Sequence, residues 1–337
     1  MLKRTLLIAM GAALTLPIPT LANDPYSECL LDEIDKTNEN ITLEQIKKLC
    51  QEKNNFETDE NDSLVAKRFV HESSREFDPF VITPHKMNYI LPARYTSDIN
   101  KDVYKVYGDG DITEEWPDGL KNTEVKFQVS FKVPLNWGDM LLPDDGLYFA
   151  FTIKSWWQLY ADDISSPFRE TNYQPEVFYM APMPWKPLDL NLWGSVGFEH
   201  ESNGRTQGLS RSWNRIYLDF LFEKDNYAFS FKPWWRLPEE NKSDPFQSDG
   251  DDNPDIQDYM GHFELAGAYK MEHVEFSALG RQNFSEGKGY VELGMTFPLW
   301  GHLRGYVQYT GGYGESLIDY DHNQQTVGIG VALTDIL

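Results

Sequence analysis

The chain has 337 residues and a formal net charge of −23 at pH 7. So acidic a chain is not expected to bind nucleic acid, because contacts to phosphates need clustered Lys and Arg side chains. After residue 22 no stretch approaches the roughly 20 apolar residues of a membrane-spanning helix, which excludes a helical membrane protein. Aromatic residues make up 14% of the chain, a content that suits a protein in contact with lipid headgroups.

The N-terminus has the pattern of a secretory signal peptide. Lys3 and Arg4 precede an apolar run over residues 6–16, and a small residue ends the segment. The run is too short to cross a membrane, and no stop-transfer segment follows it. We therefore expect residues 1–22 to be removed on export, so that the mature chain begins near Asn23. The alternative is a buried N-terminal helix.

Residues 23–77 differ in pattern from the rest of the chain. Apolar residues recur at helical spacing, which predicts two short helices, and the polar stretch at 52–63 predicts a linker. The two cysteines of the chain, Cys29 and Cys50, lie in this segment. In an exported protein an intrachain disulfide is the expected state, with two unpaired thiols as the alternative. We predict a small periplasmic extension.

From about residue 88 onward, apolar and polar residues alternate with a period of two. The stretch from Val125 to Val133 is one example, and such alternation is typical of β-strands. Long polar connections alternate along the chain with mostly shorter ones such as Glu223-Lys224-Asp225. Twelve strands are predicted, starting near residues 88, 123, 146, 173, 188, 213, 227, 256, 273, 289, 302 and 325.

An even number of strands with loops sorted by length is the pattern of an outer-membrane barrel, which has long external loops and short periplasmic turns. We therefore predict that residues 78–337 form an all-β, twelve-stranded antiparallel transmembrane β-barrel. The connection at 136–145 is longer than a periplasmic turn should be. A soluble β-sandwich is the alternative, but it does not explain the sorting of the loops to one end.

Two polar residues continue the apolar face of the fifth predicted strand. Apolar side chains stand at every second position from Leu188 to Phe198, and His200 and Ser202 have the same parity. On the sixth predicted strand, Asn214 shares the face that holds Ile216. All of these polar side chains are therefore expected to point outward, toward lipid, at the external end of one hairpin.

This arrangement suits nucleophilic catalysis. If the hairpin folds about residue 207, Asn214 lies beside His200 on the neighbouring strand. A serine needs a base to become nucleophilic, and the base needs a third group that holds its tautomer. An uncharged Asn also costs less to desolvate beside hydrocarbon than a carboxylate. We predict a serine esterase with Ser202 as nucleophile, His200 as base and Asn214 as the group that orients His200. A second His-x-Ser, at His71-Glu72-Ser73, lies in the polar extension and has no apolar face.

The sequence around these residues closely resembles the outer membrane phospholipase A family of Gram-negative bacteria. The likeness runs from about Asp78 to the C-terminus and does not include the extension with Cys29 and Cys50. The similar segments are Phe198-Glu199-His200-Glu201-Ser202-Asn203-Gly204-Arg205, Ser210-Arg211-Ser212-Trp213-Asn214-Arg215, Lys154-Ser155-Trp156-Trp157-Gln158-Leu159, Ser165-Ser166-Pro167-Phe168-Arg169-Glu170-Thr171-Asn172-Tyr173, Asp251-Asp252-Asn253-Pro254-Asp255-Ile256 and Gly312-Tyr313-Gly314-Glu315-Ser316-Leu317-Ile318-Asp319-Tyr320.

The resemblance implies a twelve-stranded barrel in the outer membrane with a Ser-His-Asn triad on its outer face, at the external leaflet. It implies hydrolysis of acyl esters of phospholipids and lysophospholipids, at either ester position, by a calcium-dependent enzyme that is active as a homodimer. Carried over by position, Gly204 would offer its backbone N–H to the oxyanion. The calcium ligands would be Arg205, Ser210 and Ser165 of the partner subunit.

Two positions depart from the family, and one loop has a second interpretation. Asp252 matches an acidic residue of a second calcium position, but the other acidic residue of that position is Gln207 here. The last residue, Leu337, replaces a usual aromatic. Taken alone, the acidic residues Asp249, Asp251 and Asp252 would form an ordinary external loop.

Other functions remain open at this point. A catalytically silent pore or structural barrel is the main alternative, and a barrel deacylase acting on lipopolysaccharide is a second. The remaining histidines show no partner pattern and are predicted to be structural or solvated; they are His85, His262, His273, His302 and His322.

Overall fold

The computed structural model of the chain describes Cys29, Ile46 and residues 82–107, 115–136, 139–244, 247, 250–301 and 303–333. The chain separates into two compact units, Met1–Asn61 and Asp62–Leu337, and the described strands all belong to the second. The predicted signal peptide, the predicted boundary after residue 77 and Leu337 lie outside the described residues. Within the predicted extension Cys29 and Ile46 are helical, and Cys29 is disulfide-bonded. Its predicted partner, Cys50, also lies outside the described residues.

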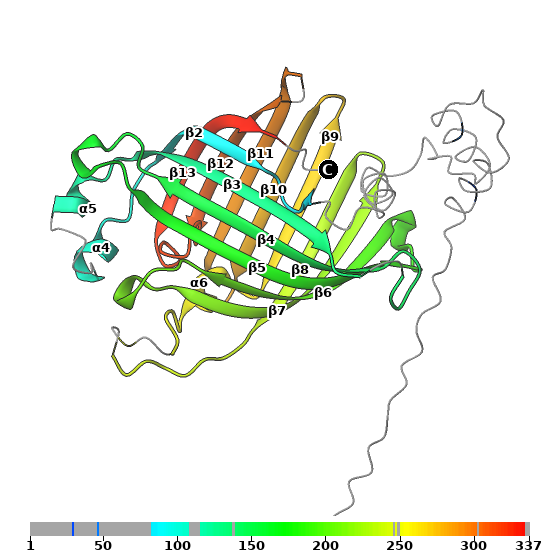
Figure 1. Cartoon of the computed structure of the whole chain (residues 1–337), viewed down its shortest axis with the longest axis horizontal. Coiled ribbons are helices and arrows are strands. Elements are labelled where there is room, and N and C mark those ends of the chain that lie inside the picture. The colour runs from blue at the N-terminus through cyan, green and yellow to red at the C-terminus, as the bar shows by residue number, and fades with distance from the viewer. Residues whose placement is uncertain are drawn as a thin grey trace, which may run out of the picture. The chain divides into compact units, whose positions relative to one another are not determined.

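The second unit consists mainly of long strands joined by loops and short helices (Figure 1). None of the helices among the described residues is long and apolar enough to cross a membrane. In chain order the elements are β1 (Thr83–Pro84), β2 (Tyr89–Thr96), α4 (Asp102–Tyr107), α5 (Glu115–Gly119), β3 (Thr123–Pro134), β4 (Gly146–Trp157), η1 (Asp162–Ile164), β5 (Phe168–Met183), η2 (Pro187–Asp189), β6 (Asn191–Ser202), η3 (Gln207–Leu209), β7 (Ser212–Lys224), β8 (Tyr227–Arg236), α6 (Ile256–Met260), β9 (Phe263–Met271), β10 (Val274–Asn283), β11 (Lys288–Trp300), β12 (Leu303–Tyr313) and β13 (Asn323–Ala332).

Strands β2 to β13 close into an antiparallel barrel. Each strand pairs with the next one along the chain, and β13 pairs with β2. The short β1 stands apart from this ring, because it pairs only with β3. The predicted twelve-stranded antiparallel barrel is therefore confirmed. Closure leaves no sheet edge unpaired, as a strand in hydrocarbon requires.

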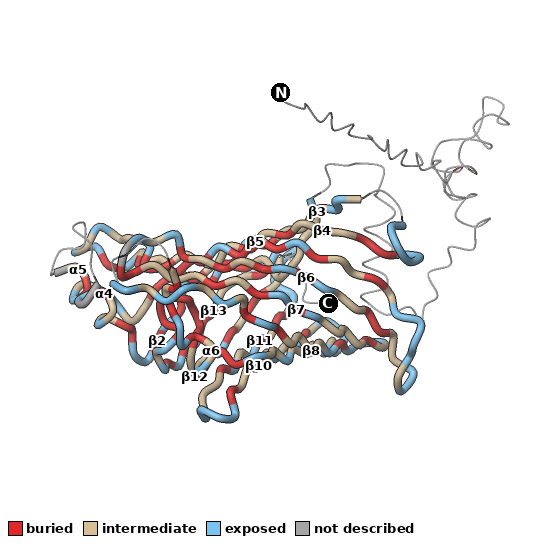
Figure 2. The backbone as a smooth tube through the Cα atoms, turned by 90° about the horizontal axis from the view of Figure 1, so that it is seen from below, coloured by how far each residue is buried: buried red, intermediate tan, exposed pale blue. Residues whose placement is uncertain are grey.

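The barrel is polar inside and apolar outside. On β3 the inward-facing Lys126, Gln128 and Ser130 are buried, whereas the outward-facing Val129 is exposed. The same reversal holds on β6, where Glu199 is buried and Phe198 is exposed, and the alternation can be followed along the strands in Figure 2. A soluble protein would bury its apolar side chains, whereas an apolar outer face is typical of a barrel in contact with lipid.

Most predicted strands begin within two residues of the observed starts, and three do not. The strands expected near residues 173 and 188 begin at Phe168 and Asn191. The prediction that a strand begins near residue 256 was wrong, because that segment forms helix α6 and β9 begins at Phe263. The buried side chains of α6, Ile256 and Met260, are four residues apart, and this spacing places them on one face of a helix.

The long connection between β3 and β4 is held together by one carboxylate. Asp145 accepts hydrogen bonds from the backbone N–H groups of Met140, Leu141 and Leu142 at 2.6, 2.6 and 2.7 Å. The hydroxyl of Tyr179 on β5 donates to the same carboxylate at 2.5 Å. A turn this long has additional backbone N–H groups that need hydrogen-bond acceptors. Asp145 supplies acceptors for three of them, which explains how the longer turn is tolerated.

The loop between β12 and β13 folds into the barrel instead of extending outward. Leu317 and Ile318 in this loop are each 1% exposed. Glu315 accepts from Arg94 at 2.6 Å and from Lys126 at 3.0 Å, and Asp319 accepts from Arg169 at 2.9 Å. Buried charges are tolerated only when they are paired in this way. The loop therefore acts as an internal plug at this end of the barrel.

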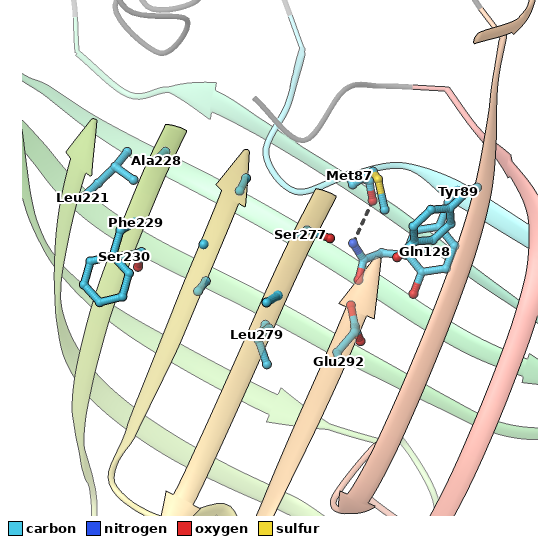
Figure 3. Close-up of a pocket in the computed structure, with 15 residues that line it drawn as sticks. Met87, Tyr89, Gln128, Leu221, Ala228, Phe229, Ser230, Ser277, Leu279 and Glu292 are labelled. Carbon is cyan, nitrogen blue, oxygen red and sulfur yellow. Dashed lines mark hydrogen bonds between the residues drawn. The ribbon is translucent and has the colours of Figure 1, made fainter. Parts of the chain in front are cut away.

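The lumen beyond the plug is narrow. One cavity of about 480 Å³ is lined by apolar and many charged side chains, and the charged ones include Lys154, Glu199 and Glu292. A second cavity, of about 250 Å³, has Ala228 and Ser230 on one wall and Tyr89 on another (Figure 3). These are pockets between packed side chains, and the plug stands over the barrel on the side of the long loops.

Candidate active site on the outer face of the barrel

His200, Ser202 and Asn214 lie on the hairpin formed by β6 and β7. His200 faces Asn214 directly in the register of the two strands, and Ser202 faces Ser212. Their outward parity agrees with the pattern, since Val196 and Phe198 on the same face of β6 are exposed. The three predicted residues therefore share one patch of the lipid-facing surface, at the end of the hairpin that carries the long loops.

The histidine and the asparagine are hydrogen-bonded. The distance from His200 Nδ1 to Asn214 Oδ1 is 2.9 Å. Because an amide oxygen only accepts, this contact requires the proton to be on Nδ1, and the lone pair of Nε2 is then free to act as a base. Within the described chain Ser202 makes no hydrogen bond to His200. Such catalytic contacts often shorten only when substrate is bound.

Residue Gly204 follows the strand and turns the chain. Its φ is +64°, a conformation that favours glycine, and an added Cβ would lie 3.3 Å from the ring of Tyr173. The buried side chain of Asn203 holds the turn, since its Oδ1 accepts from the backbone N–H groups of Arg205 at 3.2 Å and Arg211 at 3.0 Å. The backbone around Gly204 is therefore fixed beside Ser202.

The oxygens predicted to bind calcium come together only in part. Ser210 Oγ donates to Asp252 Oδ2 at 2.7 Å, and Ser212 Oγ donates to the same oxygen at 3.2 Å. The Arg205 guanidinium, which has no oxygen to offer, donates to the carbonyl oxygen of Arg169 at 2.6 Å, so that only the backbone oxygen of Arg205 could bind a cation. Ser165, which ends η1 with a φ of 60°, is not part of this hydrogen-bonded group. Gln207 lies in η3.

A lysine contacts the same carboxylate. Lys242 Nζ forms an ion pair with Asp252 Oδ1, and both side chains are almost fully buried. Among the described residues, no group of three or more His, Cys, Asp or Glu side chains is arranged to hold a metal ion. Any cation at Asp252 would therefore depend on hydroxyl and backbone oxygens for most of its ligands, which are donor types that calcium accepts.

Sequence reasoning did not single out Asn203, Glu239 or Lys242. Asn203 lies inside a segment that resembles the family, so a closer reading of that segment could have found it. Glu239, which accepts from Asn214 Nδ2 at 3.0 Å, and Lys242 lie in the loop after β8. That loop shows neither strand nor helix periodicity, and no pattern could have placed these two side chains.

The predicted structural role of other histidines agrees with the contacts seen for three of them. His85 contacts Glu176 at 2.8 Å, His262 contacts Gln257 at 2.9 Å, and His322 contacts the carbonyl oxygen of Asp98 at 3.0 Å. None of these partners is His200, Ser202 or Asn214.

Comparisons with known proteins give a consistent result. Residues 65–333 match the family described as Phospholipase A1. The chain is 40% identical over 260 residues to phospholipase A1 of Escherichia coli strain K12, covering 77% of this chain and 83% of the relative. It is 38% identical over 264 residues to phospholipase A1 of Klebsiella pneumoniae, with 77% and 84% covered.

Solved structures show the same fold. One is an active-site mutant of outer membrane phospholipase A from Escherichia coli in which an asparagine is replaced by alanine. It has a TM-score of 0.71 and 38% identity, covering 80% of this chain and 98% of that chain. Another is the Salmonella typhi outer membrane phospholipase dimer with bound calcium. Its TM-score is 0.70 at 38% identity, with 80% and 98% covered.

Proposed function

The chain belongs to the phospholipase A1 family of outer-membrane β-barrels, which are carboxylic ester hydrolases, and on that premise we propose that it hydrolyses acyl esters of membrane phospholipids and lysophospholipids. In this proposal Ser202 is the nucleophile, His200 the base and Asn214 the orienting group. The observation that carries it is the 2.9 Å contact between His200 Nδ1 and Asn214 Oδ1 on the lipid-facing surface. A related active-site mutant with an asparagine replaced by alanine supports the role of Asn214.

The proposed reaction uses Ser202 Oγ as the nucleophile and His200 Nε2 as the base. As Ser202 Oγ attacks the acyl carbonyl carbon, His200 Nε2 accepts the hydroxyl proton. The tetrahedral intermediate collapses, the ester C–O bond breaks, and the imidazolium returns the proton to the departing lysophospholipid or glycerol oxygen. Water, deprotonated by the same nitrogen, then attacks the acyl-enzyme. The bond between the acyl carbon and Ser202 Oγ breaks, the imidazolium returns the proton to Oγ, and the fatty acid leaves.

The location of the site suits a substrate that arrives through the bilayer. The side chains next to His200 and Asn214 on the same face include the exposed Phe198, Ile216 and Leu218. An acyl chain lying on these residues would keep its contact with apolar surface while its ester group reaches Ser202. A neutral Asn214 costs less to hold there than a charged aspartate would.

The negative charge of the intermediate needs hydrogen-bond donors. The turn at Gly204 brings its backbone close behind Ser202, and in our proposal its N–H group stabilises the oxyanion. Calcium fits the chemistry of the nearby oxygens: we propose Ser210, the backbone oxygen of Arg205 and Ser165 of the partner subunit as ligands of one ion, and Asp252 as the acidic residue of a second position. When bound there, the cation would supply positive charge that polarises the ester carbonyl. The calcium-bound dimer of the Salmonella typhi relative supports both the metal and a homodimer.

The test replaces the nucleophile and keeps the barrel. Ser202→Ala should abolish fatty-acid release from mixed phospholipid micelles, while heat-modifiable gel mobility shows that the protein is folded. Ser277→Ala, a serine-to-alanine change in the lumen, is the matched control and should retain activity. If folded Ser202→Ala protein still releases fatty acid at the original rate, the proposed triad is wrong.

A further inference from the structure

The loop after β8 runs back toward the active-site hairpin. The last paired residues of β7 and β8 in this region are Arg215 and Arg236. One step further, the Leu237 N–H donates to the Asn214 carbonyl oxygen at 2.8 Å. The chain is therefore still in register with Asn214 when it leaves the barrel, and Glu239 follows two residues later.

The side chain of Glu239 is connected to His200 through Asn214 by two hydrogen bonds. Asn214 Nδ2 donates to Glu239 Oε1 at 3.0 Å, while Asn214 Oδ1 contacts His200 Nδ1 at 2.9 Å. A carboxylate only accepts hydrogen bonds, and the amide nitrogen of Asn only donates. Glu239 thus determines which end of the Asn214 amide faces His200.

The opposite orientation of the amide would have a chemical cost. Turned over, Asn214 would place its oxygen against the carboxylate of Glu239 and its NH₂ group against His200 Nδ1. Nδ1 would then have to accept, and the ring proton would move to Nε2, the atom that must take the proton of Ser202. The contact with Glu239 excludes this inactive arrangement.

The charge of Glu239 has a second effect. A neutral orienting residue cannot offset the positive charge that forms on His200 during the reaction. Glu239 places a negative charge one hydrogen-bonded group away, and hydrogen bonds to ionised groups are roughly twice as strong as neutral ones. The pair Asn214–Glu239 can therefore do part of what a single aspartate would do.

The loop is built to hold this position. The Asp251 N–H donates to the Glu240 carbonyl oxygen at 2.7 Å, and the Asp251 carboxylate accepts from Arg236 at 2.5 Å. Gly250 has a φ of +103°, and a Cβ there would lie 2.7 Å from the Glu240 oxygen. The segment next to Glu239 is therefore fastened both to the end of β8 and to the chain that leads into α6.

We propose that Glu239 is a positioning residue that orients Asn214, so that the working unit is Ser202–His200–Asn214–Glu239. The inference rests on the proposed triad. Glu239→Ala should lower kcat about tenfold with little change in KM, a loss that corresponds to about 1.4 kcal/mol of transition-state stabilisation. Glu239→Gln keeps an acceptor oxygen without the charge, and should lose only about two- to threefold.

The decisive measurement is a double-mutant comparison in mixed micelles. In an Asn214→Ala background, Glu239→Ala should have little further effect on kcat, because the amide that Glu239 orients, and through which its charge acts on His200, is gone. Glu240→Ala, a change of the neighbouring exposed carboxylate, should leave kcat unchanged. Folding of each variant is followed by heat-modifiable mobility, and Glu239→Gln, which keeps the shape of the side chain, is the reserve if Glu239→Ala does not fold.

The outcomes separate the two proposals. An unchanged kcat in folded Glu239→Ala, or additive losses with Asn214→Ala, would overturn the positioning role even if Ser202→Ala is inactive. Retained activity in Ser202→Ala would instead remove the proposed function on which that role depends.

Discussion

The ammonium group of Lys242 and the carboxylate of Asp252 form an ion pair in which both side chains are more than nine-tenths buried. The same carboxylate accepts the hydroxyl of Ser210 at 2.7 Å. Ser210 and Asp252 are two of the proposed calcium ligands. A calcium ion at this site would therefore compete with a cation that the chain itself supplies.

Removing that lysine should strengthen calcium binding. We expect Lys242→Met, in an inactive Ser202→Ala background, to lower the Kd for calcium by roughly tenfold, a change that corresponds to about 1.4 kcal/mol. Isothermal titration calorimetry of the detergent-solubilised protein measures it without activity. Lys224→Met, which removes an equal charge from the exposed pair with Asp189, is the control. Equal affinities of the Lys242 and Lys224 variants would show that Lys242 does not compete.

Exchanging the orienting residue should be harmful here, although many serine hydrolases use an aspartate. Asn214→Asp would put a second carboxylate where an amide nitrogen now lies 3.0 Å from Glu239, and like charges so close repel. We expect kcat at neutral pH to fall at least tenfold, because an increase of about 1.4 kcal/mol in the activation free energy already has this effect.

A second substitution should restore activity. In Asn214→Asp/Glu239→Gln the amide of residue 239 donates to the new carboxylate, and the polarity of the pair is reversed. The double variant should recover most of the lost kcat in the micelle assay, whereas Asn214→Asp/Glu240→Gln should not. Recovery in both variants, or in neither, would contradict the geometry assigned to Asn214 and Glu239.

The barrel and the hairpin could be predicted because both depend on a period of two. Outward parity placed His200 and Ser202 beside exposed apolar residues, and symmetry about residue 207 paired His200 with Asn214. These relations are local, and they need no knowledge of the loops. The same rule misplaced the strand near residue 256, where the chain forms a single helical turn.

Contacts made by the loops could not be predicted in this way. Glu239 and Lys242 reach the site because the loop after β8 is fastened by Arg236 and Asp251, an ion pair between residues with no sequence pattern. Glu315 is similar, because its loop folds inward to meet Arg94 and Lys126 on β2 and β3. Long-range pairing of charges decides these positions, and it leaves no periodic signal.

The turn between β3 and β4 should depend on pH through Asp145. Burial alone raises the pKa of the Asp145 carboxyl, but hydrogen bonds from Tyr179 and three backbone N–H groups bring that pKa well below its usual range. A lowered pKa in the folded state means that the stabilisation is complete above the unfolded pKa of about 3.9 and is lost as the pH falls toward the folded value.

Asp145→Asn should therefore lower the free energy of unfolding between pH 5 and 8, when this is measured in ~0.1 M salt. Below about pH 4 the difference in this free energy between the variant and the unmodified protein should shrink. Urea unfolding from lipid vesicles at several pH values measures both. Asp139→Asn is the matched control, because Asp139 accepts a single backbone N–H, at 2.9 Å from Asp144 N. A difference that is constant down to pH 2 would contradict the assignment.

Each ion-paired carboxylate of the plug should contribute more to stability than a neutral hydrogen bond inside the barrel. Burial alone raises the pKa of the Glu315 carboxyl, but the neighbouring Arg94 and Lys126 bring it well below its usual range. Glu315→Gln would leave Lys126 without its counter-ion and Arg94 with Glu124 as its one remaining carboxylate partner among the described residues, and breaking a buried ion pair costs about 3–5 kcal/mol. Urea unfolding of the variant should show a loss of this size. Thr326→Val, which removes a buried hydroxyl bonded to Thr310 at 2.6 Å, should cost only about 1 kcal/mol. Equal losses in the two variants would mean that the ion pairs add nothing to the ordinary hydrogen bonds of the lumen.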